Sequence, residues 1–199
     1  MPYTAQSFDP LLGTQGFSDT LLKNHFTLYQ GYVTNTNKLA DELAQLLKEG
    51  QVGTPHYAEV KRRFGWEFNG MRLHELYFGN MNKARKALDR NSALAQQLAQ
   101  AFGSVDDWGK DFKTTGAMRG IGWAAVSWDP VGRRPFNIWV NEHDAGHLAG
   151  CPVLLIMDVF EHAFVLDYGL KRADYIEAFF NAIDWEVVQG RFDAALKRA

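Results

Sequence analysis

The sequence predicts an α+β protein, with an N-terminal long α-hairpin domain followed by a C-terminal α/β domain that contains a small three-stranded antiparallel sheet. Apolar residues recur at helical spacing over two long stretches, about 17–49 and 55–78, which a short break containing glycine and proline separates. Three short stretches typical of strands follow at 122–128, 136–140 and 153–157. We therefore expect a helical hairpin domain over 1–88 and an α+β domain over 89–199.

Local signals mark the ends of the two long helices. Ser18 is the expected N-cap of the first helix, and the segment 49–55 ends it. Thr54 is the expected cap of the second helix, with Pro55 at its first position, where the missing N–H of proline costs nothing. Two long helices with so short a connection favour an antiparallel pair.

The C-terminal half mixes helices with strands. Helices are expected over 92–102, 105–119, 172–183 and from there to the end, and the segment 129–132 is the expected turn between the first two strands. Cys151 stands beside the apolar third strand, so we expect it to be a small buried hydrophobic residue.

Composition excludes several classes of protein. The 199 residues are 46% hydrophobic and 22% charged, as in ordinary globular proteins, and the net charge of −2 does not suit a nucleic-acid binder. No apolar run is long enough to cross a bilayer, and the first residues lack the features of a signal peptide. A single cysteine excludes an internal disulfide and fits a reducing compartment. We expect a cytoplasmic protein with no nucleic-acid and no membrane partner.

A carboxylate and an imidazole at the end of the third strand indicate a metal site. Asp158 closes the apolar run 153–157, and His162 follows four residues later. A buried carboxylate needs a cation, a hydrogen-bond donor or water beside it. His25 and His74 lie on the apolar faces of the two long helices. Either histidine alone is more typical of a hydrogen-bonded core residue, but together the four could supply three nitrogen ligands and one oxygen ligand.

Other metal motifs fit less well. The pair His74-Glu75 begins like the zinc protease motif, but Phe78 stands where the second histidine belongs. The Glu-X-X-His pairs of di-iron bundles are absent. A two-histidine, one-carboxylate site is possible in ligand type, yet it would leave one histidine unused.

Several segments closely resemble the iron/manganese superoxide dismutase family. The most specific are DVFEHAF at 158–164 and RADYIEAFFNAIDW at 172–185. GIGWA at 120–124 and GYVTNTN at 31–37 match two further family segments, and FNGMRLHELYFGNM at 68–81 is similar to the second ligand helix in its archaeal-like form. The resemblance covers nearly the whole chain. It implies an N-terminal helical hairpin, a C-terminal α+β domain and a metal between them, with two ligands from each.

By position, the resemblance implies His74, Asp158 and His162 as metal ligands. The family has its first ligand histidine eight residues before the tyrosine that is Tyr32 here, and this chain has Asn24 at that place. His25 lies seven residues before Tyr32, nearly on the same helix face, and imidazole suits this class of metal better than a carboxamide. We expect His25 to be the fourth ligand.

The resemblance also implies roles for residues around the metal. Tyr32 would relay a proton, and His143 would tune the metal-bound solvent, with a histidine in a surface turn as the alternative interpretation. Trp123 would wall the solvent side or serve as an ordinary core aromatic. Glu161 would bond the ligand histidine of a partner subunit, which implies a homodimer and possibly a tetramer. Arg172 resembles an arginine at the mouth of the site, with helix capping or ion pairing as the alternative.

This chain departs from the family pattern at several positions. A histidine that pairs across the dimer with a tyrosine is replaced by Tyr29 or Leu28, and that tyrosine is replaced by Val165. Phe160 and Phe78 stand where the family has tryptophan. The expected activity is superoxide dismutation at one iron or manganese ion, with a slight preference for iron. The alternative is a metal-binding relative with little or no activity that acts as a structural or interaction protein.

Overall fold

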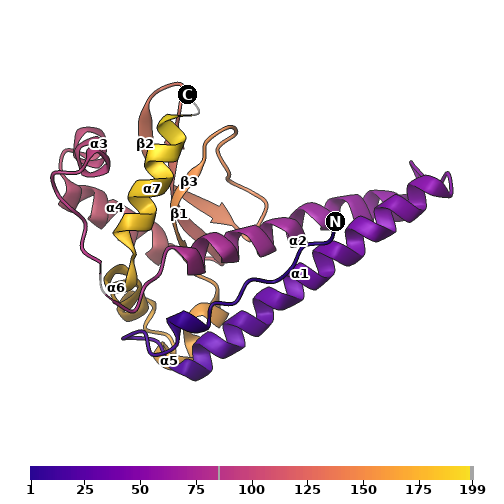
Figure 1. Ribbon diagram of the computed structural model, residues 1–199, viewed down its shortest axis with the longest axis horizontal. Coiled ribbons are helices and arrows are strands. Elements are labelled where there is room, and N and C mark those ends of the chain that lie inside the picture. Colours follow the sequence, from indigo (N-terminus) through magenta and orange to yellow (C-terminus); the bar gives the residue numbers. More distant parts are fainter. Residues whose placement is uncertain (85, 198–199) are drawn as a thin grey trace.

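The N-terminal half is a hairpin of two long antiparallel helices, α1 (Asp19–Lys48) and α2 (Pro55–Gly79), whose far end extends well beyond the rest of the molecule (Figure 1). The computed structural model of the chain describes residues 1–84 and 86–197. Ser18 accepts a hydrogen bond from the backbone N–H of Leu21, and Thr54 accepts one from Tyr57. Both predicted caps and the predicted break between the helices are confirmed.

The C-terminal half packs helices around a three-stranded antiparallel sheet of order β2-β1-β3 (Figure 1). Helices α3 and α4 pack against β2, α4 also packs against β1, and α7 and α2 pack against β3. The fold class is therefore the predicted one. The elements are β1 (Gly122–Asp129), β2 (Arg134–Asn141), β3 (Val153–Asp158), α3 (Ala93–Phe102), α4 (Val105–Ala117), α5 (Val165–Tyr168), α6 (Arg172–Ala182) and α7 (Trp185–Leu196), with single 3₁₀ turns η1 (Asp9–Leu11) and η2 (Glu161–Ala163).

Burial explains why β3 is apolar from Val153 to Met157. This strand lies at one edge of the sheet, but α2 and α7 cover it, and every residue after Val153 is buried. Seven consecutive residues of β1 are buried as well, because it is the central strand. Asp158 ends β3 opposite Trp123 of β1, so a carboxylate lies at the end of two buried strands. The sheet thereby places one polar group at the base of the hairpin.

A partly buried arginine joins the helical half to the sheet. Arg191 of α7 donates hydrogen bonds to the backbone oxygens of Leu76 (2.9 Å) and Leu154 (3.1 Å), and to Asn80 Oδ1 (3.2 Å). Asn80 in turn accepts from the N–H of Ile156 (2.9 Å) in β3. Burial lowers the pKa of Arg191 to about 10, so the guanidinium keeps its charge at neutral pH. These bonds fix the end of α2 against β3.

The structure corrects some details of the sequence interpretation. Cys151 is only partly buried, because it lies in the loop before β3 rather than in the strand. The helical stretch expected at 105–119 ends at Ala117, and the short elements η1, η2 and α5 were not predicted. Among the described residues, no helix combines the length and apolar character that crossing a bilayer requires. The domain boundary at residue 88 stays a prediction.

Candidate metal centre

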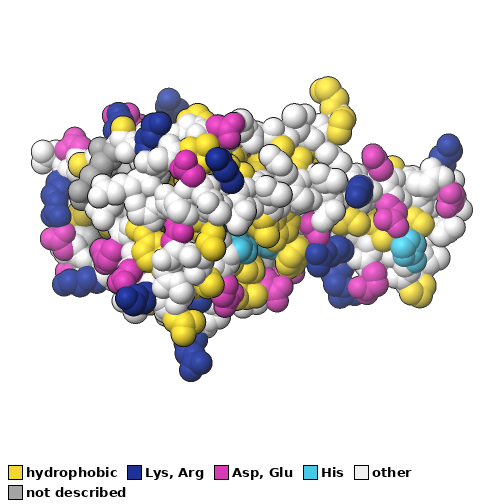
Figure 2. Space-filling view, turned by 90° about the horizontal axis from the view of Figure 1, so that it is seen from below, with side chains coloured by type: hydrophobic (Ala, Val, Ile, Leu, Met, Phe, Trp, Pro, Cys, Tyr) yellow, Lys and Arg dark blue, Asp and Glu magenta, His cyan; other side chains and the backbone are white. Residues whose placement is uncertain are grey.

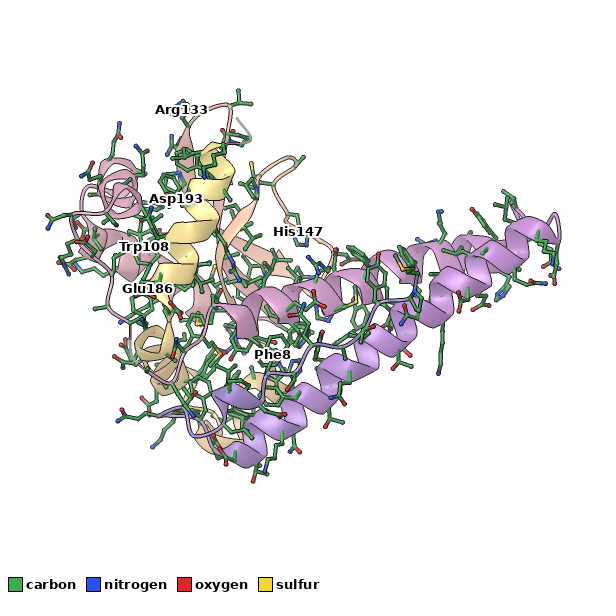
Figure 3. All side chains as sticks on the ribbon, viewed as in Figure 1. Phe8, Trp108, Arg133, His147, Glu186 and Asp193 are labelled. Atoms are coloured by element: carbon green, nitrogen blue, oxygen red, sulfur yellow. The ribbon has the colours of Figure 1, made fainter. Side chains whose placement is uncertain are left out.

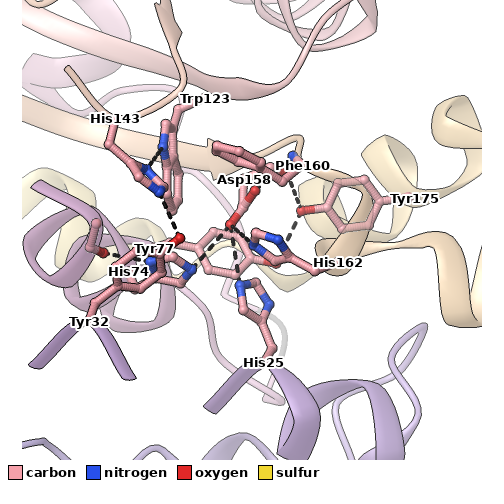
Figure 4. A network of polar contacts seen from close by, with 11 residues as sticks. His25, Tyr32, His74, Tyr77, Trp123, His143, Asp158, Phe160, His162 and Tyr175 are labelled. Carbon is pink, nitrogen blue, oxygen red and sulfur yellow. Dashed lines mark hydrogen bonds and ion pairs between the residues drawn. The ribbon is translucent and has the colours of Figure 1, made fainter. Parts of the chain in front are cut away.

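Four side chains from four elements converge where the base of the hairpin meets the sheet (Figure 4). His25 comes from α1, His74 from α2, Asp158 from the end of β3 and His162 from η2. One atom from each lies within 4.8 Å of the others, and all but the half-buried His162 are buried. The structure thus brings together the four residues predicted as ligands, two from each half of the chain.

The Asp158 carboxylate is the centre of this cluster. Its Oδ2 lies 3.2 Å from His25 Nε2, 3.5 Å from His74 Nε2 and 3.2 Å from His162 Nε2. Its other oxygen, Oδ1, accepts a hydrogen bond from the backbone N–H of Phe160 (2.8 Å). One oxygen is therefore held by the chain, which orients the other toward the three imidazoles.

Two further contacts fix the orientation of these groups. His74 Nδ1 lies 2.6 Å from the carbonyl oxygen of Gly70, one helical turn earlier, so Nδ1 carries the proton and Nε2 keeps a free lone pair. The hydroxyl of Tyr175 donates to the backbone oxygen of Asp158 (2.5 Å), and the Tyr77 hydroxyl lies 3.1 Å from that of Tyr175. These bonds anchor the ligand-bearing segments from behind.

The protonation states at the cluster suit a cation. Burial lowers the pKa of His25, and burial together with His25 lowers that of His74 further, so both imidazoles are neutral at pH 7. Burial alone would raise the pKa of Asp158, but electrostatic attraction by His162 and His25 and the hydrogen bond with His162 lower it below its ordinary value. The cluster therefore presents a carboxylate and two neutral imidazoles, those of His25 and His74.

The cluster fits a bound metal ion. His25 Nε2 and His74 Nε2 are buried and have no hydrogen-bond partner among the described residues, although each faces the Asp158 carboxylate. Buried polar atoms without a partner are rare and costly. A cation would satisfy both nitrogens and the carboxylate together, and three imidazoles with one carboxylate suit a divalent or trivalent transition metal.

The helix register decides between Asn24 and His25. Asn24 is exposed on α1, whereas His25 is 2% exposed and packs against Phe78, with ring centroids 4.8 Å apart. Tyr29 is also buried, one turn after His25, where it accepts from the N–H of Gln6 and donates to Glu75. The inward face of α1 thus carries the histidine, and the asparagine points away.

A chain of three polar side chains runs beside the cluster (Figure 4). Trp123 Nε1 donates to His143 Nδ1 (3.1 Å), and His143 Nε2 lies 2.9 Å from the Tyr32 hydroxyl. The Tyr32 ring stacks on the His74 imidazole, with centroids 5.1 Å apart. Trp123 also contacts His74, edge to face at 5.0 Å. His143 is therefore a buried residue of the site rather than a histidine in a surface turn.

The hydrogen-bond donors among these three side chains determine which atoms carry the protons. An indole N–H can only donate, so His143 Nδ1 accepts and its proton is on Nε2. The Nε2–H therefore donates to the Tyr32 oxygen and leaves the Tyr32 proton free to be donated onward. Burial lowers the pKa of His143 to about 4, which keeps it neutral. Burial and the Asp158 charge raise the pKa of Tyr32, so its hydroxyl stays protonated.

Two predicted residues lie outside this inner cluster. Glu161 is exposed on the surface of the chain, next to the half-buried ligand candidate His162. Arg172 donates to the backbone oxygens of Met118 (2.7 Å) and Gly120 (3.0 Å), where α4 ends. This is the capping role given as the alternative for Arg172. The role of Glu161 toward a partner stays a prediction.

Sequence reasoning missed residues that support the site from α2. Trp66 packs on His143 with ring centroids 4.5 Å apart, and a Cβ at Gly70 would lie 2.5 Å from the ring of Tyr32. Trp66, Gly70 and His74 follow one another at intervals of four and so lie along one helix face. That spacing was a signal that could have found Trp66.

A buried site of three histidines and one aspartate, held between a helical hairpin and an α+β domain, defines a mononuclear metal protein. A family model described as iron/manganese superoxide dismutases, C-terminal domain, matches residues 90–191. The chain is 32% identical to superoxide dismutase [Mn] 2 of Haloferax volcanii over 197 residues, which cover 99% of this chain and 95% of that protein. The chain belongs to the iron/manganese superoxide dismutase family.

Other relatives carry either metal in their names. Superoxide dismutase [Fe] of Saccharolobus solfataricus is 29% identical over all of this chain and 93% of its own length. Superoxide dismutase [Fe] of Aquifex pyrophilus is 32% identical over 92% of this chain and 87% of its own. Similarity at this level therefore extends to relatives named for iron and to relatives named for manganese.

Proposed function

We propose that this protein is a superoxide dismutase, which converts two superoxide ions and two protons to oxygen and hydrogen peroxide. The observation that carries the proposal is the position of the Tyr32 hydroxyl, which ends a chain of donors directly beside the cluster of three histidines and one aspartate. Family membership supports the same activity. The reaction requires electron transfer and proton delivery. The three histidines and the aspartate would hold the metal that transfers the electron, and Tyr32 would deliver the proton.

The bound ion would be iron or manganese, held by His25, His74, Asp158 and His162. When bound, it supplies one-electron chemistry between its +3 and +2 states. Many relatives have a glutamine at one of two positions, which here are Gly70 and His143. Glycine and histidine at these positions slightly favour iron. Iron and manganese both occur among the names of the relatives.

The residues of the chain would deliver protons to the reduced substrate. Tyr32 is partly exposed, and its hydroxyl proton is not used in the bond with His143, so Tyr32 can donate to a substrate oxygen and recover a proton from solvent. His143 holds the tyrosine oxygen in place through Nε2–H. Trp123 fixes the tautomer of His143 and, being fully buried, keeps water away from that side.

One of the two observations that favour a metal-binding relative with little or no activity no longer holds. The two observations are the asparagine at position 24 and the missing cross-dimer pair at Tyr29 and Val165. Because His25 faces the cluster and Asn24 points away, the first reason no longer applies. Tyr29 uses its hydroxyl within the chain instead, as the acceptor for Gln6 and the donor to Glu75.

The proposed assembly is a cytoplasmic homodimer, which could pair further into a tetramer. Leu170 is 97% exposed, Leu166 56% and Val165 41%, and all three follow Glu161 in the chain. Figure 2 shows the lower face of the molecule, where hydrophobic side chains gather beside the base of the hairpin. A second copy could cover such apolar side chains and meet Glu161. Sedimentation of the purified protein at several concentrations tests this assembly.

Elemental analysis paired with a superoxide-consumption assay tests the function. The expected result is about one iron or manganese ion per chain and turnover that His162→Ala abolishes together with metal binding. Tyr32→Phe should keep the metal but lower turnover when superoxide is saturating, because the hydroxyl donor is gone. Stoichiometric metal with activity near background would instead favour the structural or interaction role.

A further inference from the structure

Glu142, which directly precedes His143, adopts an unfavourable backbone conformation. Its φ is +47°, in the left-handed region that asparagine and glycine adopt far more readily than glutamate. It belongs to a tight turn after β2, in which the N–H of Asn141 donates to the oxygen of Ala145 (2.7 Å). This turn leads from the end of the sheet to His143. A glutamate at such a position indicates that an interaction of its side chain compensates for the unfavourable backbone conformation.

The Glu142 side chain reaches the helical hairpin. Trp66 Nε1 in α2 donates to Glu142 Oε2 at 3.0 Å, and both residues are half-buried. The two residues are 76 positions apart in the sequence, so the bond joins the end of β2 to the hairpin. Asparagine would suit the backbone better but is one methylene shorter, and it would not span this distance without movement.

Trp66 lies against both members of the proton path. Its ring centroid is 4.5 Å from that of His143 and 5.6 Å from that of Tyr32. The Arg63 guanidinium lies 3.9 Å from the centroid of the Trp66 ring. These contacts hold the indole in an ordered position. Because Glu142 and His143 are neighbours in the sequence, the indole contacts one short segment through both residues.

We propose that Glu142 and Trp66 form a positioning pair, which holds His143 at hydrogen-bond distance from the Tyr32 hydroxyl. Neither residue touches the substrate, and both act through His143. The inference rests on the proposed dismutase function and adds to it a dependence of proton delivery on one hydrogen bond between the two halves of the chain. No titration is involved, since the pair acts by geometry.

Glu142→Asn separates this role from a purely structural one. The variant relieves the backbone and removes the bond, so we expect an unfolding temperature at least equal to that of the native protein. Turnover at saturating superoxide should nevertheless fall about tenfold, while kcat/KM changes less than about twofold, because proton delivery and not capture is impaired. Glu142→Gln keeps an acceptor oxygen at the same reach and should restore most of kcat.

The chain supplies a matched control at Arg133. This residue is the other non-glycine residue with positive φ among those described, at +50°, and it lies at the tip of the sheet far from the hairpin (Figure 3). Arg133→Asn makes the same backbone change without touching the site. Its kcat should equal that of the native protein, so any loss in Glu142→Asn comes from the lost side chain.

Trp66→Phe tests the partner, because it removes the N–H donor and keeps an aromatic ring, although a smaller one. It should lower kcat at least as much as Glu142→Asn, and the double variant should be no worse than Trp66→Phe, since both substitutions remove the same bond. Crystal structures of the metal-loaded variants should show His143 Nε2 more than about 3.5 Å from the Tyr32 hydroxyl, beyond hydrogen-bond range.

Several results would overturn the pairing. They are an unchanged kcat and an unchanged His143 position in Glu142→Asn, multiplied losses in the double variant, or a loss of kcat that simply follows a loss of stability. If the native protein had no dismutase activity, the proposed function would fail on that assay alone. The crystallographic position of His143 in the variants would still decide whether the pair holds it.

Discussion

Adding a single methyl group to Gly70 should disturb the site by moving Tyr32. A Cβ at this position would lie 2.5 Å and 2.7 Å from two carbons of the Tyr32 ring. Ordinary contacts between carbon atoms are roughly 3.5–4.0 Å, so the ring must move by about 1 Å. The hydrogen bond from His143 to the Tyr32 oxygen is 2.9 Å and would then exceed hydrogen-bond range.

The expected cost of Gly70→Ala is the sum of three effects. Overpacking costs about 1–3 kcal/mol, and the lost hydrogen bond costs about 1 kcal/mol. Replacing glycine by alanine inside a helix returns about 1 kcal/mol. The free energy of unfolding should therefore fall by about 1–3 kcal/mol, measured by urea unfolding, and kcat should fall about tenfold or more because the proton donor is displaced.

Gly65→Ala is the matched control for this experiment. Gly65 lies in the same helix, and a Cβ there would meet nothing within 4 Å. This variant should be stabilised by up to about 1 kcal/mol through helix propensity alone, with unchanged kcat. If Gly70→Ala were as stable and as active as Gly65→Ala, with the His143–Tyr32 bond intact in its crystal structure, the reasoning from ring contact would be wrong.

Three further predictions concern metal, pH and stability. Asp158→Asn should lose stoichiometric metal on dialysis, measured by elemental analysis; full retention would contradict the central place of this carboxylate. Burial lowers the pKa of His143 from 6.5 to about 4. The neutral imidazole therefore stabilises the fold fully above pH 6.5, and about 3 kcal/mol of this stability is lost as the pH falls toward 4. His143→Gln should flatten this part of the free energy of unfolding plotted against pH, measured by urea unfolding. Arg191→Met should lower the free energy of unfolding by about 2–4 kcal/mol, because it removes three hydrogen bonds that a charged group donates to Leu76, Leu154 and Asn80; a loss below about 0.5 kcal/mol would show that these acceptors find other donors.

The fold could be predicted because local patterns and tertiary structure agree. Ser18 and Thr54 cap the helices at the predicted positions, and the apolar run before Asp158 is a strand whose residues after Val153 are all buried. The short elements between Phe160 and Gly169 could not be predicted. They are single turns, and such short segments carry too little periodicity to be recognised.

The candidate site could be predicted only in part. Asp158 and His162 are four residues apart and belong to one motif, but the choice between Asn24 and His25 depends on a rotation of about 100° around α1, which packing against Phe78 decides. The bond between Trp66 and Glu142 joins residues 76 positions apart, and no local pattern announces it. The role of Glu161 requires a second chain and stays a prediction.

The burial of the cluster has a consequence for how a metal ion enters. His25, His74 and Asp158 are at most 2% exposed, and only His162 reaches solvent. The hairpin and the sheet enclose the other three residues from opposite sides, so the open side of the site is the one at His162. We therefore expect a bound ion to exchange slowly with the folded protein, and faster under conditions that separate the hairpin from the sheet.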